Sequence, residues 1–178
     1  SLNKCLFDDK GFTCIAAWGL PPYAHLDDPA RGLLAAVEAH ALLQLLGLDS
    51  HFGVTTGTLY CGPIGSAARR EYTVIGSSVN LAARLMAADK KHLVDGDGGV
   101  LCDLTTARQC AGIRFRALPA VELKGIARPC PVFRPVDPHG QSGVLAAPSS
   151  GHHGRIRLHL MMPTLPRFVH TGQPAHRR

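Results

Sequence analysis

The chain has 178 residues, 46% of them hydrophobic, which predicts one globular domain with a core of its own. Its net charge of +6 is concentrated in residues 139–178, which hold five arginines and no acidic residue, whereas residues 1–138 are almost neutral. This distribution gives no argument for nucleic-acid binding by the folded part. No apolar run reaches the roughly 18 residues of a membrane span, and no signal-peptide pattern opens the sequence.

Six cysteines are present, and none of them forms a Cys-x-x-Cys pair, so the sequence does not favour a zinc site. Several of them lie in apolar strand patterns, where a free cysteine behaves as a small hydrophobic residue. We therefore expect a reducing, cytoplasmic setting without disulfides.

The first third of the chain alternates strand patterns with one long helix pattern. Strands are predicted over 2–7 and 12–18, on either side of a glycine turn. A helix is predicted from an Asp28 N-cap, with Pro29 first, to about residue 46 before Gly47. Its inward-facing positions are expected to be Leu33, Val37, Ala41 and Leu45.

The middle of the chain predicts a hairpin, a glycine-containing loop and a second helix. Strands over 51–55 and 58–61 are expected to join at Thr56-Gly57, and the helix covers about 78–88. Residues 90–98 are polar and rich in glycine, and Asp103 is expected to cap a short helix ending near Cys110. Three short strands follow, over 113–117, 121–124 and 132–134.

The character of the sequence changes after Pro135, which sets the predicted domain boundary. Residues 1–136 are expected to form an α+β domain, one mixed sheet with helices packed on one side of it. Residues 137–178, rich in Pro, His and Arg without periodicity, are expected to be a disordered basic tail. A basic arm for RNA or an anionic membrane is the less favoured interpretation of this tail.

Residues 69–86 are the most informative part of the sequence, because they predict a strand, a glycine turn and a helix with a polar start. Asn80 and Arg84 are four residues apart, so a helix places both side chains on one face. An amide and a guanidinium projecting together near a helix start suit an anion, while Thr73 on the preceding strand suits the far end of the same ligand. The alternative is an Asn that caps the helix and an Arg that meets only solvent.

The chain from about 2 to 135 resembles the class III nucleotidyl cyclases, the adenylate and guanylate cyclase family. Within that family, 69–76 is most similar to the second cyclase domain of the bicarbonate-responsive soluble adenylate cyclases. The resemblance implies a ferredoxin-like α+β sandwich whose central first strand and first two helices are missing from this sequence. Its elements follow the family's order in four segments: Phe52-Gly53-Val54-Thr55-Thr56-Gly57, Cys61-Gly62-Pro63-Ile64-Gly65, Arg69-Arg70-Glu71-Tyr72-Thr73-Val74-Ile75-Gly76 and Glu122-Leu123-Lys124-Gly125.

The resemblance also implies a role for five residues. Asn80 would orient the ribose of a nucleoside triphosphate, and Arg84 would stabilise the phosphate in the transition state. Lys124 would contact the β- and γ-phosphates, where the alternative is a solvated lysine at a strand end. Lys4 and Thr73 would read adenine, which favours ATP over GTP as the substrate.

The family binds two divalent ions, Mg²⁺ or Mn²⁺, through aspartates, and here the chain departs from the family's pattern. The first metal aspartate would lie before Ser1, and the second would fall within 8–12, where Asp8 and Asp9 are more easily read as solvated turn residues. We therefore expect no metal ligand in this chain. The resemblance implies a partner, a second cyclase domain that holds both ions.

The leading hypothesis is a half-domain of an adenylate cyclase that makes cyclic AMP and pyrophosphate from ATP and is inactive without its partner. A first alternative is a regulatory domain that pairs with an active half and binds nucleotide or nothing. A second is a truncated gene product, suggested by the abrupt start and the tail without acidic residues.

Overall fold

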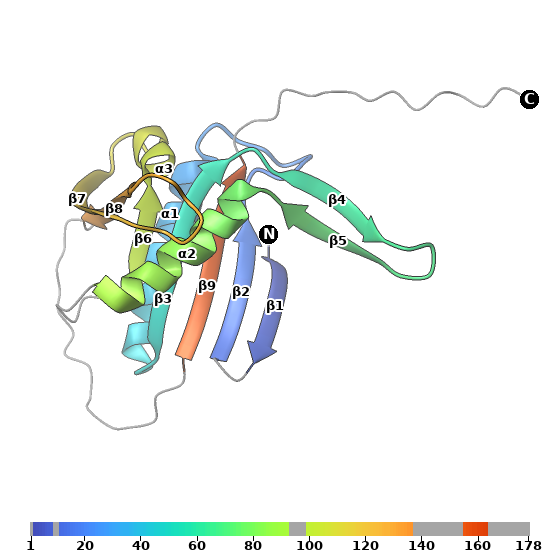
Figure 1. Ribbon diagram of the computed structural model, residues 1–178, viewed down its shortest axis with the longest axis horizontal. Coiled ribbons are helices and arrows are strands. Elements are labelled where there is room, and N and C mark those ends of the chain that lie inside the picture. Colours follow the sequence, from blue (N-terminus) through green and yellow to red (C-terminus); the bar gives the residue numbers. More distant parts are fainter. Residues whose placement is uncertain (1, 9–10, 93–98, 137–154, 164–178) are drawn as a thin grey trace, which may run out of the picture.

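A computed structural model describes the backbone of residues 2–8, 11–92, 99–136 and 155–163 (Figure 1). Within these ranges the chain forms nine strands and three helices. Their bounds are β1 Leu2–Asp8, β2 Gly11–Ala17, α1 Asp28–Leu45, β3 Asp49–Gly57, β4 Tyr60–Gly65, β5 Arg70–Ile75, α2 Ser77–His92, β6 Val100–Asp103, α3 Leu104–Gln109, β7 Arg114–Val121, β8 Cys130–Val136 and β9 Arg155–Pro163.

Seven of the described strands form one mixed sheet in the order β1-β2-β9-β3-β6-β8-β7. The pairs β2–β9, β9–β3 and β3–β6 are parallel, and the pairs β1–β2, β6–β8 and β7–β8 are antiparallel. The strands β4 and β5 form a separate antiparallel hairpin that projects from the body (Figure 1). This confirms the predicted α+β class with a mixed sheet.

The helices cover both faces of the sheet and not one face as predicted, and the alternation along β6 shows which residues face which helix. Val100 and Cys102 of β6 pack in the cluster that contains Leu33 and Ala36 of α1. Leu101, between them, packs instead with Leu85 of α2. The sheet is therefore buried between α1 on one face and α2 on the other, as Figure 1 shows with α2 in front.

The strand β9 corrects the expectation of disorder for residues 155–163. It lies between β2 and β3, paired with β2 from Phe12 to Ala17 and with β3 from Asp49 to Gly57. The resemblance leaves β2 and β3 without a partner along their inner edges. The strand β9, from a distant part of the sequence, pairs with both of them. The remaining residues of the predicted tail, 137–154 and 164–178, lie outside the described residues.

Two further expectations are wrong. The strands predicted over 51–55 and 58–61 do not pair with each other, because β3 joins the large sheet while β4 pairs with β5. The predicted inward positions of α1 hold for Leu33, which is buried, and for Val37, which packs against the same cluster, but Ala41 and Leu45 are exposed in the last turns of the helix. The helix starts at Asp28, so its N-cap is Asp27 and not Asp28 as predicted, and Gly47 follows its end with a positive φ of 69°.

Within the described ranges, no helix is both long enough and apolar enough to cross a membrane.

Candidate functional site

The turn from β5 into α2 lies against the end of β3, with little room for a side chain at two glycines. A Cβ atom at Gly76 would lie 2.7 Å from Leu59 Cδ2, and one at Gly57 would lie only 2.0 Å from Ser78 Oγ. Thr55 Oγ1 donates a hydrogen bond of 2.9 Å to the carbonyl oxygen of Ser78. These contacts fix where the first turn of α2 begins and therefore where its polar side chains project.

The middle of α2 lies directly on β3 at Gly53. A Cβ atom at Gly53 would be 2.0 Å from the carbonyl oxygen of Ala82 and 3.0 Å from the amide nitrogen of Met86. Ala82 and Leu85 are fully buried against the sheet. The opposite side of the helix carries Asn80, which is exposed, and Arg84, which is half-buried one turn later, so the predicted pair does share a face.

The structure brings Arg84 to the turn that contains Lys124. A Cβ atom at Gly125 would lie 3.5 Å from a terminal guanidinium nitrogen of Arg84 and 4.0 Å from its Cζ. The turn is closed by the Ile126 amide, which donates to the Leu123 carbonyl at 2.9 Å, and Gly125 has a φ of 77°. In Figure 1 this turn is the orange loop that crosses α2.

Packing explains why the turn stays beside Arg84. Leu123 is buried in the same cluster as Leu85, the neighbour of Arg84 in the sequence, and Val132 of β8 closes that cluster. Lys124 follows Leu123 and is exposed. One buried leucine pair therefore brings two basic residues, from segments forty residues apart in the sequence, close to each other beside α2.

The two predicted base-reading residues, Lys4 and Thr73, both lie near Glu71, a residue to which the sequence alone assigned no role. Lys4 Nζ on β1 forms an ion pair of 3.2 Å with Glu71 Oε1 on β5. Thr73 lies two residues after Glu71, so both side chains leave the strand on the same side. Glu71 was visible inside the motif, but only the approach of β1 to β5 shows that its carboxylate reaches Lys4.

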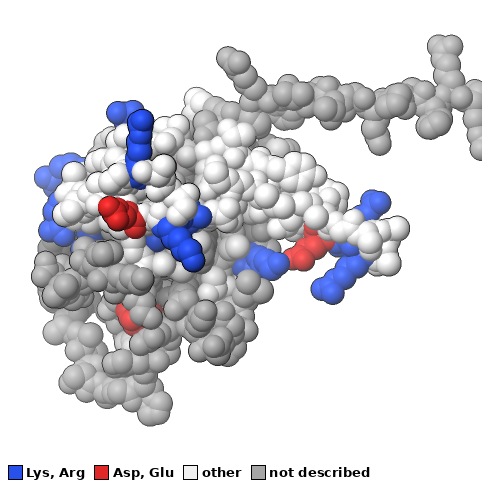
Figure 2. Space-filling model, in the orientation of Figure 1, with Lys and Arg blue, Asp and Glu red and all other residues white. Residues whose placement is uncertain are grey.

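The hairpin of β4 and β5 exposes apolar side chains along its length. The side chains of Tyr60, Ile64, Tyr72 and Ile75 are each exposed by 41–56%. Two arginines, Arg69 and Arg70, come at the start of β5, and Figure 2 shows basic side chains gathered at the far end of the hairpin. An isolated two-stranded hairpin is marginally stable in water, so this one is typical of an element that packs against a partner.

The buried carboxylates of the described residues are already engaged by protein groups. Asp28 accepts a hydrogen bond of 2.6 Å from the His25 amide and lies 3.4 Å from His25 Nδ1. Asp103 caps α3 by accepting from the Thr106 amide at 3.0 Å, as the sequence predicts. No group of three or more His, Cys, Asp or Glu side chains within the described ranges is arranged to hold a metal ion. The side chains of Asp8 and Asp9, in the region where the second metal aspartate of the family would fall, lie outside the described residues.

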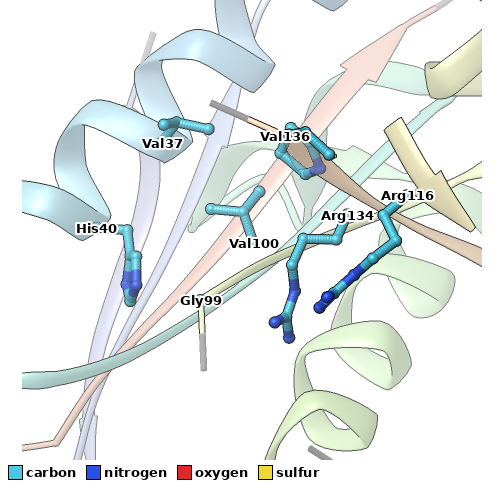
Figure 3. A pocket seen from close by; sticks show the side chains of 8 residues that line it. Val37, His40, Gly99, Val100, Arg116, Arg134 and Val136 are labelled. Carbon is cyan, nitrogen blue, oxygen red and sulfur yellow. The ribbon is translucent and has the colours of Figure 1, made fainter. Parts of the chain in front are cut away.

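A basic cavity lies away from these residues, and no sequence pattern predicted it. Its volume is about 420 Å³, and Figure 3 shows Arg116 and Arg134 extending side by side, with His40 beyond Gly99. The two arginines are direct cross-strand partners on β7 and β8. They are eighteen positions apart in the sequence, so only the pairing of the two strands could have shown this pair.

Comparisons with known proteins agree with the motifs and their arrangement, although no family model matches the sequence. Over 137 residues, 75% of this chain, it is 32% identical to adenylate cyclase type 10 of Rattus norvegicus and 31% identical to that of Homo sapiens. It is also 30% identical to adenylate cyclase 1 of Rhizobium meliloti over 125 residues, 65% of the chain. This chain belongs to the class III nucleotidyl cyclases.

The matched stretch of this cyclase domain spans 8% of the type 10 relatives and 18% of the Rhizobium relative. Among solved structures, the guanylate cyclase domain of RhGC from Catenaria anguillulae has a TM-score of 0.49 at 13% identity, covering 67% of this chain and 64% of that one. The adenylyl cyclase CyaB of P. aeruginosa has a TM-score of 0.38 at 31% identity, covering 44% and 38%.

Proposed function

We propose that this class III cyclase domain is one half of an adenylate cyclase, which forms 3′,5′-cyclic AMP and pyrophosphate from ATP together with a second cyclase domain. The observation that carries the proposal is the contact of Arg84 with the Lys124–Gly125 turn, next to Asn80 on the same helix face. Two cations and an amide on one side of α2 form a surface suited to a polyphosphate.

In the reaction the ribose 3′-oxygen attacks the α-phosphorus, and pyrophosphate leaves. Arg84 stabilises the negative charge that develops on the α-phosphate, because its guanidinium already lies beside the turn before the substrate arrives. Asn80 holds the ribose so that its 3′-oxygen is aligned for attack. Lys124 binds the β- and γ-phosphates, which are charged in both the bound substrate and the transition state.

Adenine is read by Lys4 and Thr73. A lysine ammonium donates to a ring nitrogen, and a threonine hydroxyl accepts from the exocyclic amine. The ion pair of Lys4 with Glu71 holds the ammonium beside β5 before the base binds. Because Glu71 competes for the same ammonium, its carboxylate sets how readily Lys4 turns to the base.

The two ions, Mg²⁺ or Mn²⁺, are held by the partner domain, since the described residues offer no suitable cluster. When bound, such ions activate the ribose hydroxyl and neutralise phosphate charge. The exposed apolar residues of the β4–β5 hairpin supply a surface for that partner. We place the reaction in the cytoplasm, where free cysteines persist.

A non-catalytic regulatory domain is the second candidate, and the lack of a three-ligand carboxylate or histidine group in the described part of the chain favours it. Such a domain binds ATP on the same cations but contributes nothing to turnover. The two functions differ in one respect: whether Arg84 affects the rate of cyclic AMP formation by a partner that carries the metal ligands.

The test is reconstitution with a metal-bearing cyclase half, measuring cyclic AMP formed from ATP and Mn²⁺. The chain alone is expected to be inactive, and the pair to be active. Arg84→Ala should lower kcat by about 10²-fold, as loss of an oxyanion-type donor does. Arg108→Ala on α3, an exposed arginine on a different helix, is the matched control and should leave kcat unchanged.

Three outcomes separate the hypotheses. Activity of the pair that falls with Arg84→Ala supports the catalytic half. Activity that is the same with Arg84→Ala, together with ATP binding by the chain, supports the regulatory domain. Turnover of about 1 s⁻¹ or more by the chain alone would contradict the half-domain and require metal ligands within this sequence.

A further inference from the structure

Two cysteines face each other across the first hairpin of the sheet. Cys5 on β1 and Cys14 on β2 are direct partners in the antiparallel register. Their sulfur atoms are 2.8 Å apart, in hydrogen-bonding contact. Directly opposite residues in antiparallel strands have Cα atoms about 4.5 or 5.5 Å apart, within the range that a disulfide spans. The two strands therefore need no rearrangement for the sulfurs to bond.

The two thiols differ in access. Cys5 is exposed, whereas Cys14 is 4% exposed and faces the interior. Burial, and then the contact with Cys5, raises the pKa of the Cys14 thiol to about 12. An oxidant from solvent therefore meets Cys5 first, and Cys14 is placed to react with whatever forms there.

The other cysteines on the described strands lie opposite residues that are not cysteine. Cys61 on β4 lies opposite Val74, and Cys130 on β8 lies opposite Val121. Cys102 and Cys110 are buried, and burial raises the pKa of both thiols, that of Cys110 to about 11. Among the paired cysteines of the described strands, Cys5 and Cys14 face each other directly.

We propose that Cys5 and Cys14 are a modification site, a dithiol that peroxide converts to a cross-strand disulfide. The Cys5 thiolate attacks one oxygen of hydrogen peroxide, the O–O bond breaks, and Cys5 becomes a sulfenic acid as hydroxide leaves. Cys14 sulfur then attacks the Cys5 sulfur, and the sulfenic hydroxyl leaves with the Cys14 proton as water. Two thiols and one peroxide give one disulfide and two waters.

The disulfide would fix the hairpin that carries Lys4. Lys4 precedes Cys5 on β1, next to the irregularity in the register between Leu2 and Lys4. The bond closes a loop between residues nine positions apart, which restricts the unfolded chain and stabilises the hairpin. Oxidation should therefore raise the melting temperature by a few degrees and slow amide exchange in β1, and reductant should reverse both.

Tryptic mapping tests the proposal directly, because each of the six cysteines falls in its own tryptic peptide. Cleavage after Lys4, Lys10 and Arg31 puts Cys5 in peptide 5–10 and Cys14 in peptide 11–31. The folded chain is treated with hydrogen peroxide, quenched with catalase, alkylated in denaturant and digested without reductant. The expected product is 5–10 joined to 11–31 with the loss of two hydrogen masses, and reductant should release both peptides.

Variants make the result specific. Cys5→Ser, a change at an exposed thiol, should abolish both the linked peptide and the shift in melting temperature. Cys61→Ser, a control at a half-buried cysteine of β4, should keep both. Cys5 recovered as sulfinic acid beside an alkylated Cys14, Cys5 linked to a different cysteine, or linkage only between two copies of the chain would each overturn the proposal. None of these readouts depends on cyclase activity, so they stand apart from the proposed function.

Discussion

Replacing Gly53 with alanine tests whether the contact of α2 with β3 positions the candidate site. The new Cβ would lie 2.0 Å from the carbonyl oxygen of Ala82, whereas ordinary contact begins near 3.4 Å. The helix must therefore move away by roughly 1.4 Å to reach ordinary contact, because a backbone carbonyl oxygen cannot rotate aside as a side chain can. A gap of that size weakens the packing of Leu85 and of the other side chains beneath the helix.

The expected cost is about 3 kcal/mol, the upper end for overpacking, which corresponds to a fall in melting temperature of roughly 6–12 °C. The same displacement carries Asn80 and Arg84, so kcat of the reconstituted pair should fall by about 10²-fold. Thermal unfolding followed by circular dichroism gives the first value, and cyclic AMP formation below the melting range gives the second.

Gly112→Ala is the matched control. Gly112 has a φ of 85° and no atom within 4 Å of an added Cβ, so alanine is strained there without contacting α2. It should cost about 1 kcal/mol and leave kcat unchanged. If Gly53→Ala melts within 2 °C of the parent, about half a kcal/mol in a chain of this size, or if its kcat matches that of Gly112→Ala, the positioning argument is wrong.

The remaining predictions concern other parts of the molecule. Asp103→Ala removes the cap of α3 and should lower the free energy of unfolding by about 1 kcal/mol in urea titrations, whereas Asp103→Asn should cost less. Burial raises the pKa of the Cys110 thiol to about 11, so this thiol ionises at a lower pH in the unfolded chain than in the folded one. The free energy of unfolding should therefore fall between about pH 9 and 11, and Cys110→Ala should show a shallower decline. Thr73→Ala should reduce the preference of the reconstituted pair for ATP over GTP while changing kcat less than Arg84→Ala does. Truncation after Val136 removes β9 and should give a chain that aggregates or binds a hydrophobic dye, measured by light scattering and dye fluorescence.

The sequence was sufficient to predict α2 and the cap of α3, because both signals are local. A polar helix start with an apolar face identified α2, although the helix continues to His92, beyond the predicted end. Asp103 three residues before Thr106 is a cap pattern that depends on nothing distant. The same locality let the sequence place Asn80 and Arg84 on one face.

Glycine was harder to interpret, since it serves both turns and close approaches. Thr56-Gly57 was read as a hairpin turn, yet Gly57 ends β3 and makes room for Ser78 on α2. Its role depends on a helix twenty residues later, which the local pattern does not contain. The contact between Lys4 and Glu71 was also out of reach, because it needs β1 and β5 to approach in space.

The strand β9 completes the pairing of the sheet, one of the two features that the resemblance implied to be missing. A missing central strand implied both an open sheet and absent metal ligands, but β9 pairs with β2 and β3 along both inner edges. Its sequence from Arg155 to Pro163 contains no Asp or Glu, so it supplies the missing pairing without supplying carboxylates. Closing the sheet with β9 therefore does not by itself supply metal ligands. On the proposed function, a partner domain is needed for the ions and not for completing the sheet, so we expect this half-domain to fold alone and to depend on a second cyclase domain for chemistry.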